Sequence, residues 1–209
     1  QNTATTIEYL LQQRLTPQQL KQTQLPIHLG GLGILELTNR SAAAYLGSWQ
    51  SFAAKSRNNY TDTTFKHHYP QATTHIEAAF QRILRYLPPG HPMPTWTQWT
   101  TNGHEHSQST LSKHINNQQY DDLHSNTTVL HQTILDNMHG PGNGAWLYPN
   151  PLSTQSIPEI HYAIALKLRL GMATHTENET CQHNTSGTFC GEPLDTHAHH
   201  SMSCQTGPH

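Results

Sequence analysis

The chain has 209 residues, a formal net charge of −2, and only 33% hydrophobic and 11% charged residues. This length allows one or two domains, and the low charge does not match the highly charged composition that is typical of disordered chains. No stretch approaches the roughly 20 apolar residues of a membrane-spanning helix, so we expect no membrane partner. The chain begins with Gln1 and shows no signal-peptide pattern, so we expect a segment of a longer reading frame that acts inside the cell, in the nucleus or cytoplasm.

Apolar residues recur at helical spacing in the first quarter of the chain. Residues 4–22 predict two short helices, the second starting with Thr16 as N-cap and Pro17 at its first position. Three glycines follow within residues 25–34, and they predict a tight apolar turn because no phosphate-loop pattern accompanies them. From Thr38 to about Arg57 the spacing predicts the best-defined helix of the chain.

The middle of the chain alternates helical patterns with polar stretches. Residues 58–69 are expected to form a polar loop, and 70–87 a helix that Pro88-Pro89-Gly90 ends. Residues 91–104 look like a loop, whereas 105–138 predict one long helix or two shorter ones.

Tyr120, Asp121 and Asp122 lie within the last of these helical regions. Adjacent aspartates hold Mg²⁺ in polymerase sites, but neighbours on a helix point about 100° apart, which is poor for joint chelation. We therefore interpret the trio as a solvated helix face.

A flexible break is expected at residues 139–144, followed by a proline-rich stretch. The next helix is predicted to start with Ser156 as its cap and to close at Gly171. Lys167 and Arg169 lie near its carboxyl end, where positive charge suits the helix dipole.

All three cysteines lie in the 24 residues from Cys181 to Cys204, and four histidines accompany them: His183, His197, His199 and His200. Thiolate and imidazole are the ligands that zinc prefers, usually four in a tetrahedron. His200 and Cys204 are four residues apart, a spacing that puts both on one face of a helix. Cys190 precedes Gly191, which lets the chain turn tightly around an ion. We therefore expect zinc as the cofactor.

The fourth ligand is less certain from spacing alone. Cys181 is nine residues before Cys190, whereas zinc ligands usually pair two to four residues apart, so His197 or His183 are alternates. Asp195 is expected either to bond a ligand imidazole or to cap the following helix. The motifs of catalytic zinc sites are absent, so the predicted site is structural and the segment is not expected to catalyse a reaction itself.

Three separated stretches of the chain form an ordered set of motifs. The first is Leu25-Pro26-x3-Gly30-Gly31-Leu32-Gly33-Ile34 with Ala42-Ala43-Ala44-Tyr45-Leu46-x-Ser48-Trp49. The second is Gly144-Ala145-Trp146-Leu147-x3-Pro151 with Ala165-Leu166-x-Leu168-Arg169-Leu170-Gly171, and the third is Cys190-Gly191-x3-Asp195-x4-His200-x3-Cys204. Together they resemble the reverse transcriptases of non-LTR retrotransposons. The first resembles the segment just after the polymerase thumb, the second the helical linker that follows, and the third the Cys/His knuckle that precedes the endonuclease.

This resemblance implies a mainly α fold, an irregular multi-helix bundle with a small C-terminal metal knuckle. It divides the chain into the end of a thumb-like region (1–24), a helical linker (25–172) and a zinc-knuckle segment (173–209). The implied parent is an RNA-directed DNA polymerase. The implied partners are RNA or DNA of the element and the rest of the parent polyprotein.

Several side chains are candidates for nucleic-acid contacts on this interpretation. Tryptophans can stack on bases, although core packing is the commoner role of so large an aromatic side chain. Arginines and lysines can hold phosphates, and the candidates are Trp96, Trp99, Trp146, Arg82, Arg85, Lys167 and Arg169. The alternative is a helical protein-interaction module with a structural zinc site and no role with nucleic acid.

Overall fold

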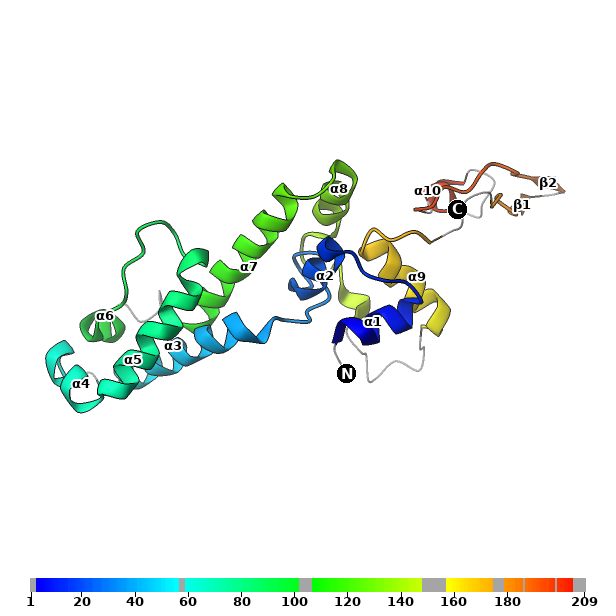
Figure 1. Ribbon diagram of the computed structural model, residues 1–209. Helices are drawn as coiled ribbons and strands as arrows, with labels where there is room; N and C mark the ends of the chain where they lie inside the picture. The colour runs from blue at the N-terminus through cyan, green and yellow to red at the C-terminus, as the bar shows by residue number, and fades with distance from the viewer. Residues whose placement is uncertain are drawn as a thin grey trace. The chain divides into compact units, whose positions relative to one another are not determined.

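The computed structural model describes residues 3–56, 59–101, 107–147, 157–174, 179–185, 187–197 and 199–204. The chain is mainly helical, which confirms the predicted fold class (Figure 1). Its contacts define two compact units, one of residues 34–126 and one of residues 1–33 together with 127–209. These units follow spatial contacts, whereas the expected segments 1–24, 25–172 and 173–209 follow the order of motifs along the chain.

The unit of residues 34–126 is built on three longer helices. They are α3 (Leu37–Lys55), α5 (Pro70–Ile83) and α7 (Gln108–Ser125), and α3 packs against both of the others. The 3₁₀ turn η1 (Leu84–Tyr86) extends α5. The apolar positions that predicted these helices fill the core, as Leu46, Phe80 and Ile115 show. This arrangement follows from apolar stripes that must be buried against one another.

Two short helices occupy stretches that the sequence predicts as loops. Helix α4 (Asp62–His68) lies within 58–69, and α6 (Trp96–Thr101) lies within 91–104. Thr61 caps α4 by accepting a hydrogen bond from the backbone N–H of Thr64. The rings of Phe65 and Trp96 stack with centroids 4.6 Å apart. Their few apolar residues are large aromatics, which bury much apolar surface. Helices this short show no clear apolar periodicity, so the sequence pattern did not predict them.

The other unit contains the remaining elements. They are α1 (Thr3–Leu11), α2 (Pro17–Gln24), α8 (Val129–Met138), η2 (Ala145–Leu147), α9 (Glu159–Arg169), β1 (Asn184–Thr185), β2 (Thr188–Phe189) and α10 (His199–Ser203). Thr16 caps α2 as predicted, with Pro17 at its first position. The expected cap Ser156 lies outside the described residues. Among the helices of the described chain, none is long and apolar enough to cross a membrane.

The glycine turn of residues 25–33 is packed into this unit, as the sequence predicts. The guanidinium of Arg169, only 1% exposed, donates to the carbonyl oxygens of Ile27 and Gly31 at 2.5 and 3.0 Å. Gln22 donates to the carbonyl oxygens of Gly30 and Arg169. A Cβ at Gly31 would lie 2.0 Å from the carbonyl oxygen of Leu25, so this close approach requires glycine. These hydrogen bonds therefore hold the glycine turn against the carboxyl end of α9.

Candidate metal centre

A two-stranded antiparallel ribbon brings Cys181 and Cys190 together. Strand β1 pairs with β2, and the pairing continues past the strands to the bridge between Thr180 and Pro193. The backbone N–H of Cys190 donates to the carbonyl oxygen of His183 at 2.9 Å. Gly191, at φ +67°, donates to the carbonyl oxygen of Cys181 at 3.2 Å. The chain thus folds back between the two cysteines and brings them close, although they are nine residues apart in the sequence.

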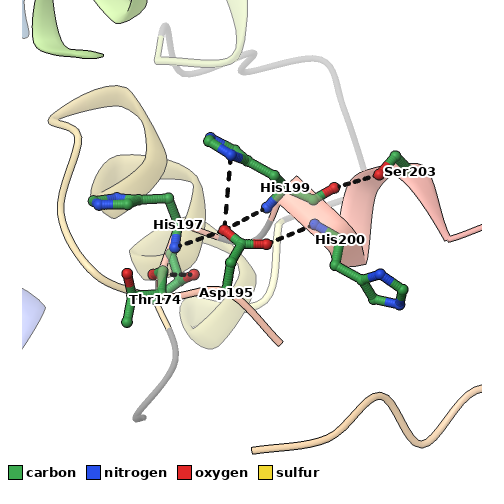
Figure 2. Close-up of polar contacts among 7 residues, drawn as sticks. Thr174, Asp195, His197, His199, His200 and Ser203 are labelled. Atoms are coloured by element: carbon green, nitrogen blue, oxygen red, sulfur yellow. Dashed lines mark hydrogen bonds and ion pairs between the residues drawn. The ribbon is translucent and has the colours of Figure 1, made fainter. Parts of the chain in front are cut away.

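Helix α10 supplies the other two side chains. His200 lies in the helix and Cys204 directly follows it, so the four-residue spacing places both on one face. Asp195 caps this helix (Figure 2): Oδ2 accepts the backbone N–H of His200 at 2.7 Å, and Oδ1 accepts that of His199 at 3.0 Å. Oδ1 also accepts the N–H of His197 at 3.0 Å. Asp195 therefore fixes the backbone from which His200 projects.

The four ligand atoms of Cys181, Cys190, His200 and Cys204 all lie within 4.8 Å of one another. The Cys181 and Cys204 sulfurs are 3.8 Å apart, and the Cys190 sulfur is 3.3 Å from His200 Nε2. A tetrahedral Zn²⁺ with Zn–S bonds of about 2.3 Å separates its sulfurs by about 3.8 Å and leaves about 3.5 Å between sulfur and nitrogen. The three cysteines form no disulfide. The side chains thus have the spacing of a tetrahedral metal site.

Cys181, the least supported ligand by sequence spacing, belongs to this group. The alternates His197 and His183 do not belong to this group. The backbone carbonyl of His183 accepts a hydrogen bond within the ribbon. The ring centroid of His197 lies 6.1 Å from that of His199. Of the two roles left open for Asp195, its hydrogen bonds show helix capping. Its Oδ1 lies 3.8 Å from the ring nitrogen Nδ1 of His199, which is not a candidate ligand.

The local environment acts in opposite directions on two pKa values. Hydrogen bonds from the backbone N–H groups of His200, His199 and His197 lower the pKa of Asp195 to about 2, against a smaller opposing effect of burial. At Cys181 a hydrogen bond from the His183 backbone lowers the thiol pKa, but burial and the neighbouring thiols outweigh it and the net pKa is raised. Without a metal the Cys181 thiol thus resists ionisation, whereas a bound cation would favour its thiolate.

Four protein side chains complete this coordination set. A catalytic zinc site keeps one position for water or substrate, whereas a structural site closes all four with Cys and His. The arrangement can therefore hold a metal ion and tie the ribbon to α10. The residues themselves do not fix the identity of the metal.

The residues predicted for nucleic acid have different environments. Trp96 and Trp99 are 3% and 2% exposed in the core of their unit, and Arg169 is committed to backbone carbonyls. None of these three presents a face or charge to solvent for a base or phosphate. Arg82 and Arg85 are exposed, and Arg85 donates to the Tyr86 hydroxyl at 2.6 Å.

Two further candidates lie at the surface of the other unit. Lys167 is half-buried, and Trp146, also half-buried, packs edge-on against Tyr162 with ring centroids 5.5 Å apart.

In α7, Asp121 and Asp122 are exposed, which confirms the predicted solvated helix face.

The ribbon is the feature of the site that spacing rules miss. Its turn carries a local signal, since Asn184 accepts the backbone N–H of Gly187 at 2.9 Å, and Gly187 has a φ of +86°. Asn followed closely by Gly between residues with strand propensity is typical of a hairpin. A hairpin centred there predicts that Cys181 and Cys190 meet.

Comparison of the chain with protein-family models, curated proteins and solved structures finds no match in any of the three. The assignment of a metal site therefore depends on the geometry of its four residues alone.

Proposed function

We propose that this chain is a non-catalytic connector whose C-terminal segment is held by a structural Zn²⁺, and that it positions RNA or target DNA within a retroelement reverse transcriptase. The observation that carries the proposal is the convergence of Cys181, Cys190, His200 and Cys204 on one point. The resemblance of the chain's motifs to the region between polymerase and endonuclease supplies the biological setting.

Zinc is the metal that suits this donor set best. Three thiolates and one imidazole form a standard structural zinc site, and Mg²⁺ or Ca²⁺ would require oxygen ligands instead. The described regular elements of the C-terminal segment are short, because β1 and β2 have two residues each and α10 has five. Metal binding can supply the folding free energy that so small a segment lacks.

Charge distribution supports a nucleic-acid role for the 34–126 unit. This unit has seven lysines and arginines against six aspartates and glutamates, whereas the rest of the chain has four against seven. Eight of the 18 histidines also lie between residues 34 and 126. The formal net charge of −2 is thus divided into +1 on residues 34–126 and −3 on the rest of the chain, and phosphate binding favours the more positive part.

The alternative is a module that binds protein through a helix face and has no nucleic-acid role. It is favoured by exposed isoleucines at helical spacing on α9 and just before it: Ile157, Ile160 and Ile164 are 49%, 66% and 39% exposed. Exposed apolar residues that share one face are typical of a protein-binding surface. On the connector proposal, the same face would contact the rest of the parent polyprotein.

Binding of structured RNA and of duplex DNA as a function of salt tests the proposal. The zinc-loaded chain should bind either probe at low salt, with affinity that falls as salt rises. Zinc content measured on the same sample should be one equivalent per chain. Loss of binding at every salt concentration in a zinc-loaded sample would favour the protein-interaction module instead.

A further inference from the structure

We propose that the groove between α3 and α5 is a phosphodiester-binding site that receives the sugar-phosphate backbone of a single-stranded nucleic acid. This inference rests on the proposed nucleic-acid role and assigns it to one surface of the 34–126 unit. The groove has a volume of about 310 Å³ and is lined by Ser41, Ala42, Tyr45, His75, Ala78, Ala79 and Arg82.

Helix geometry explains why a groove forms there. Ser41 and Tyr45 are four residues apart on α3, and His75 and Arg82 are seven apart on α5, so each pair lies along one face of its helix. Alanines form the floor between them. Because alanine is small, two packed helices leave a channel at this level that larger side chains would fill.

Three of the polar side chains that line the groove are available for a ligand. Within the described part of the chain, the guanidinium of Arg82, the imidazole of His75 and the phenol of Tyr45 have no hydrogen-bond or ion-pair partner. Arg82 and His75 are exposed, and Tyr45 is half-buried with its ring edge-on to Trp49 at 6.3 Å. Ser41 differs, because its hydroxyl already donates to the carbonyl oxygen of Thr38 at 2.8 Å. The groove therefore offers three donor groups from two helices.

No carboxylate is among the side chains that line the groove. No aspartate or glutamate lies within α3. The only carboxylate of α5, Glu77, is two residues from His75 and five from Arg82, so it points about 160° and 140° away from them around the helix. Arg85 in η1 is not one of the lining residues, because its guanidinium donates to the Tyr86 hydroxyl at 2.6 Å. An anion entering the groove thus meets positive charge without a competing acid on either helix.

A phosphodiester matches these groups better than a neutral ligand does. A guanidinium binds phosphate oxygens with two donors in a fixed plane, and a phenolic hydroxyl adds a neutral donor. The groove is open, which suits a chain that passes through rather than a small molecule that is enclosed. Single strands are favoured because their backbone can follow a narrow channel between helices, with the groove tracking phosphates.

The test uses the full chain loaded with zinc and a fluorescein-labelled oligonucleotide, with fluorescence anisotropy read over a range of salt concentrations. Arg82→Gln should lower the slope of log affinity against log salt by about 0.7, the value for one phosphate contact on a single strand. At about 0.1 M salt this corresponds to about a fivefold loss of affinity. Tyr45→Phe removes a neutral donor, so affinity should fall with the slope unchanged. Arg82 is exposed and Tyr45 is half-buried, so circular dichroism verifies that each variant is folded.

Lys55→Gln is the matched control, because it removes one exposed positive charge at the end of the same helix, ten residues beyond Tyr45. It should leave the slope unchanged. An oligonucleotide with neutral methylphosphonate linkages should bind wild type and Arg82→Gln equally weakly. Inorganic phosphate at equal ionic strength should compete no better than chloride, since a single ion spans less of the groove than a strand.

The outcomes separate this inference from the proposed function. If wild type binds the oligonucleotide and Arg82→Gln and Lys55→Gln lower the slope equally, the charge acts diffusely and the groove assignment is overturned, while the nucleic-acid role stands. Specific displacement by inorganic phosphate would make the groove a phosphate-ion site and would also overturn it. If wild type fails to bind the oligonucleotide at low salt but binds structured RNA or duplex DNA, the groove assignment alone is overturned. If wild type binds none of the three probes at low salt, both proposals are removed.

Discussion

The sulfur atoms of Cys181 and Cys204 lie 3.8 Å apart, although the two residues are 23 positions apart in the sequence. One belongs to the ribbon and the other follows α10, so this contact joins the two parts of the C-terminal segment. The distance is too long for a disulfide, whose sulfurs lie about 2.05 Å apart. It equals the edge of a zinc–thiolate tetrahedron, about 3.8 Å. A shared metal is the simplest reason for two thiols to be held at this distance.

Cys181→Ser should abolish stoichiometric zinc binding, because the remaining three ligands leave the tetrahedron open. Zinc content by mass spectrometry should drop below one equivalent after dialysis against a weak chelator. Amide hydrogen exchange should accelerate between residues 179 and 204 and stay unchanged in 34–126. His197→Ala is the control, since His197 lies outside the ligand group. Full zinc retention by Cys181→Ser would remove Cys181 from the ligand set and restore the histidine alternates.

Asp195→Asn should weaken zinc binding while leaving every ligand in place. The asparagine keeps one acceptor oxygen, but it loses the charge that now caps α10 and accepts the N–H groups of His200 and His199. Residues that orient a ligand typically change metal affinity by about tenfold or more when mutated. Competition with a fluorescent zinc chelator measures this change. Glu192→Gln removes an exposed carboxylate of the same segment and should leave affinity unaltered; equal losses in both variants would indicate a general charge effect.

Sequence patterns located the longer helices because each has a recurring apolar stripe. A recognisable start located the short helix α2, which Thr16 caps through the N–H of Gln19. The same patterns missed α4 and α6, whose stability comes from contacts between distant aromatics such as Phe65 and Trp96. They also undervalued Cys181, because zinc spacing rules assume a tight turn and here a hairpin brings the ligands together. Strand pairing brings the two cysteines together, and the only local sign of this pairing in the sequence is the turn from Asn184 to Gly187.

Arg169→Lys should destabilise the unit formed by residues 1–33 and 127–209. Arg169 donates from three different nitrogens to the carbonyl oxygens of Gly31, Asn143 and Ile27, and a lysine ammonium cannot span these three positions from one plane. Leaving buried carbonyls without donors costs about 1–3 kcal/mol for each group. We expect a loss of about 3 kcal/mol in the free energy of unfolding, measured with urea.

Lys167→Arg is the matched control for that substitution, because Lys167 is a half-buried cation on the same helix with no role in the glycine turn. It should change stability by no more than about 0.5 kcal/mol. Zinc-saturated samples keep the metal centre constant in both variants. A loss of similar size in the two proteins would mean that the carbonyl contacts of Arg169 contribute little.

His131 should make the stability of its unit fall as the pH drops below about 6.5. Its side chain is 8% exposed against Gly171, and Nε2 has no hydrogen-bond partner among the described residues. Burial lowers the pKa of His131 below the ordinary value of 6.5. Between that lowered pKa and 6.5, the unfolded state binds a proton that the folded state does not, so acid favours unfolding. The loss is at most about 1.4 kcal/mol per pH unit and stops once the folded imidazole is also protonated.

His131→Gln removes this titration and provides the comparison. Urea unfolding at pH 7.5 and pH 5.5, with zinc in excess, should show a smaller pH-dependent loss in the variant than in wild type. His67→Gln removes an exposed histidine of α4 and should behave like wild type. It is the control for the loss of any one histidine from a chain that has 18. The difference between the two variants isolates the buried imidazole, because all remaining histidines and the metal centre are common to both. Identical pH dependence in His131→Gln and wild type would mean that the folded protein accepts a proton at His131 as readily as the unfolded chain does.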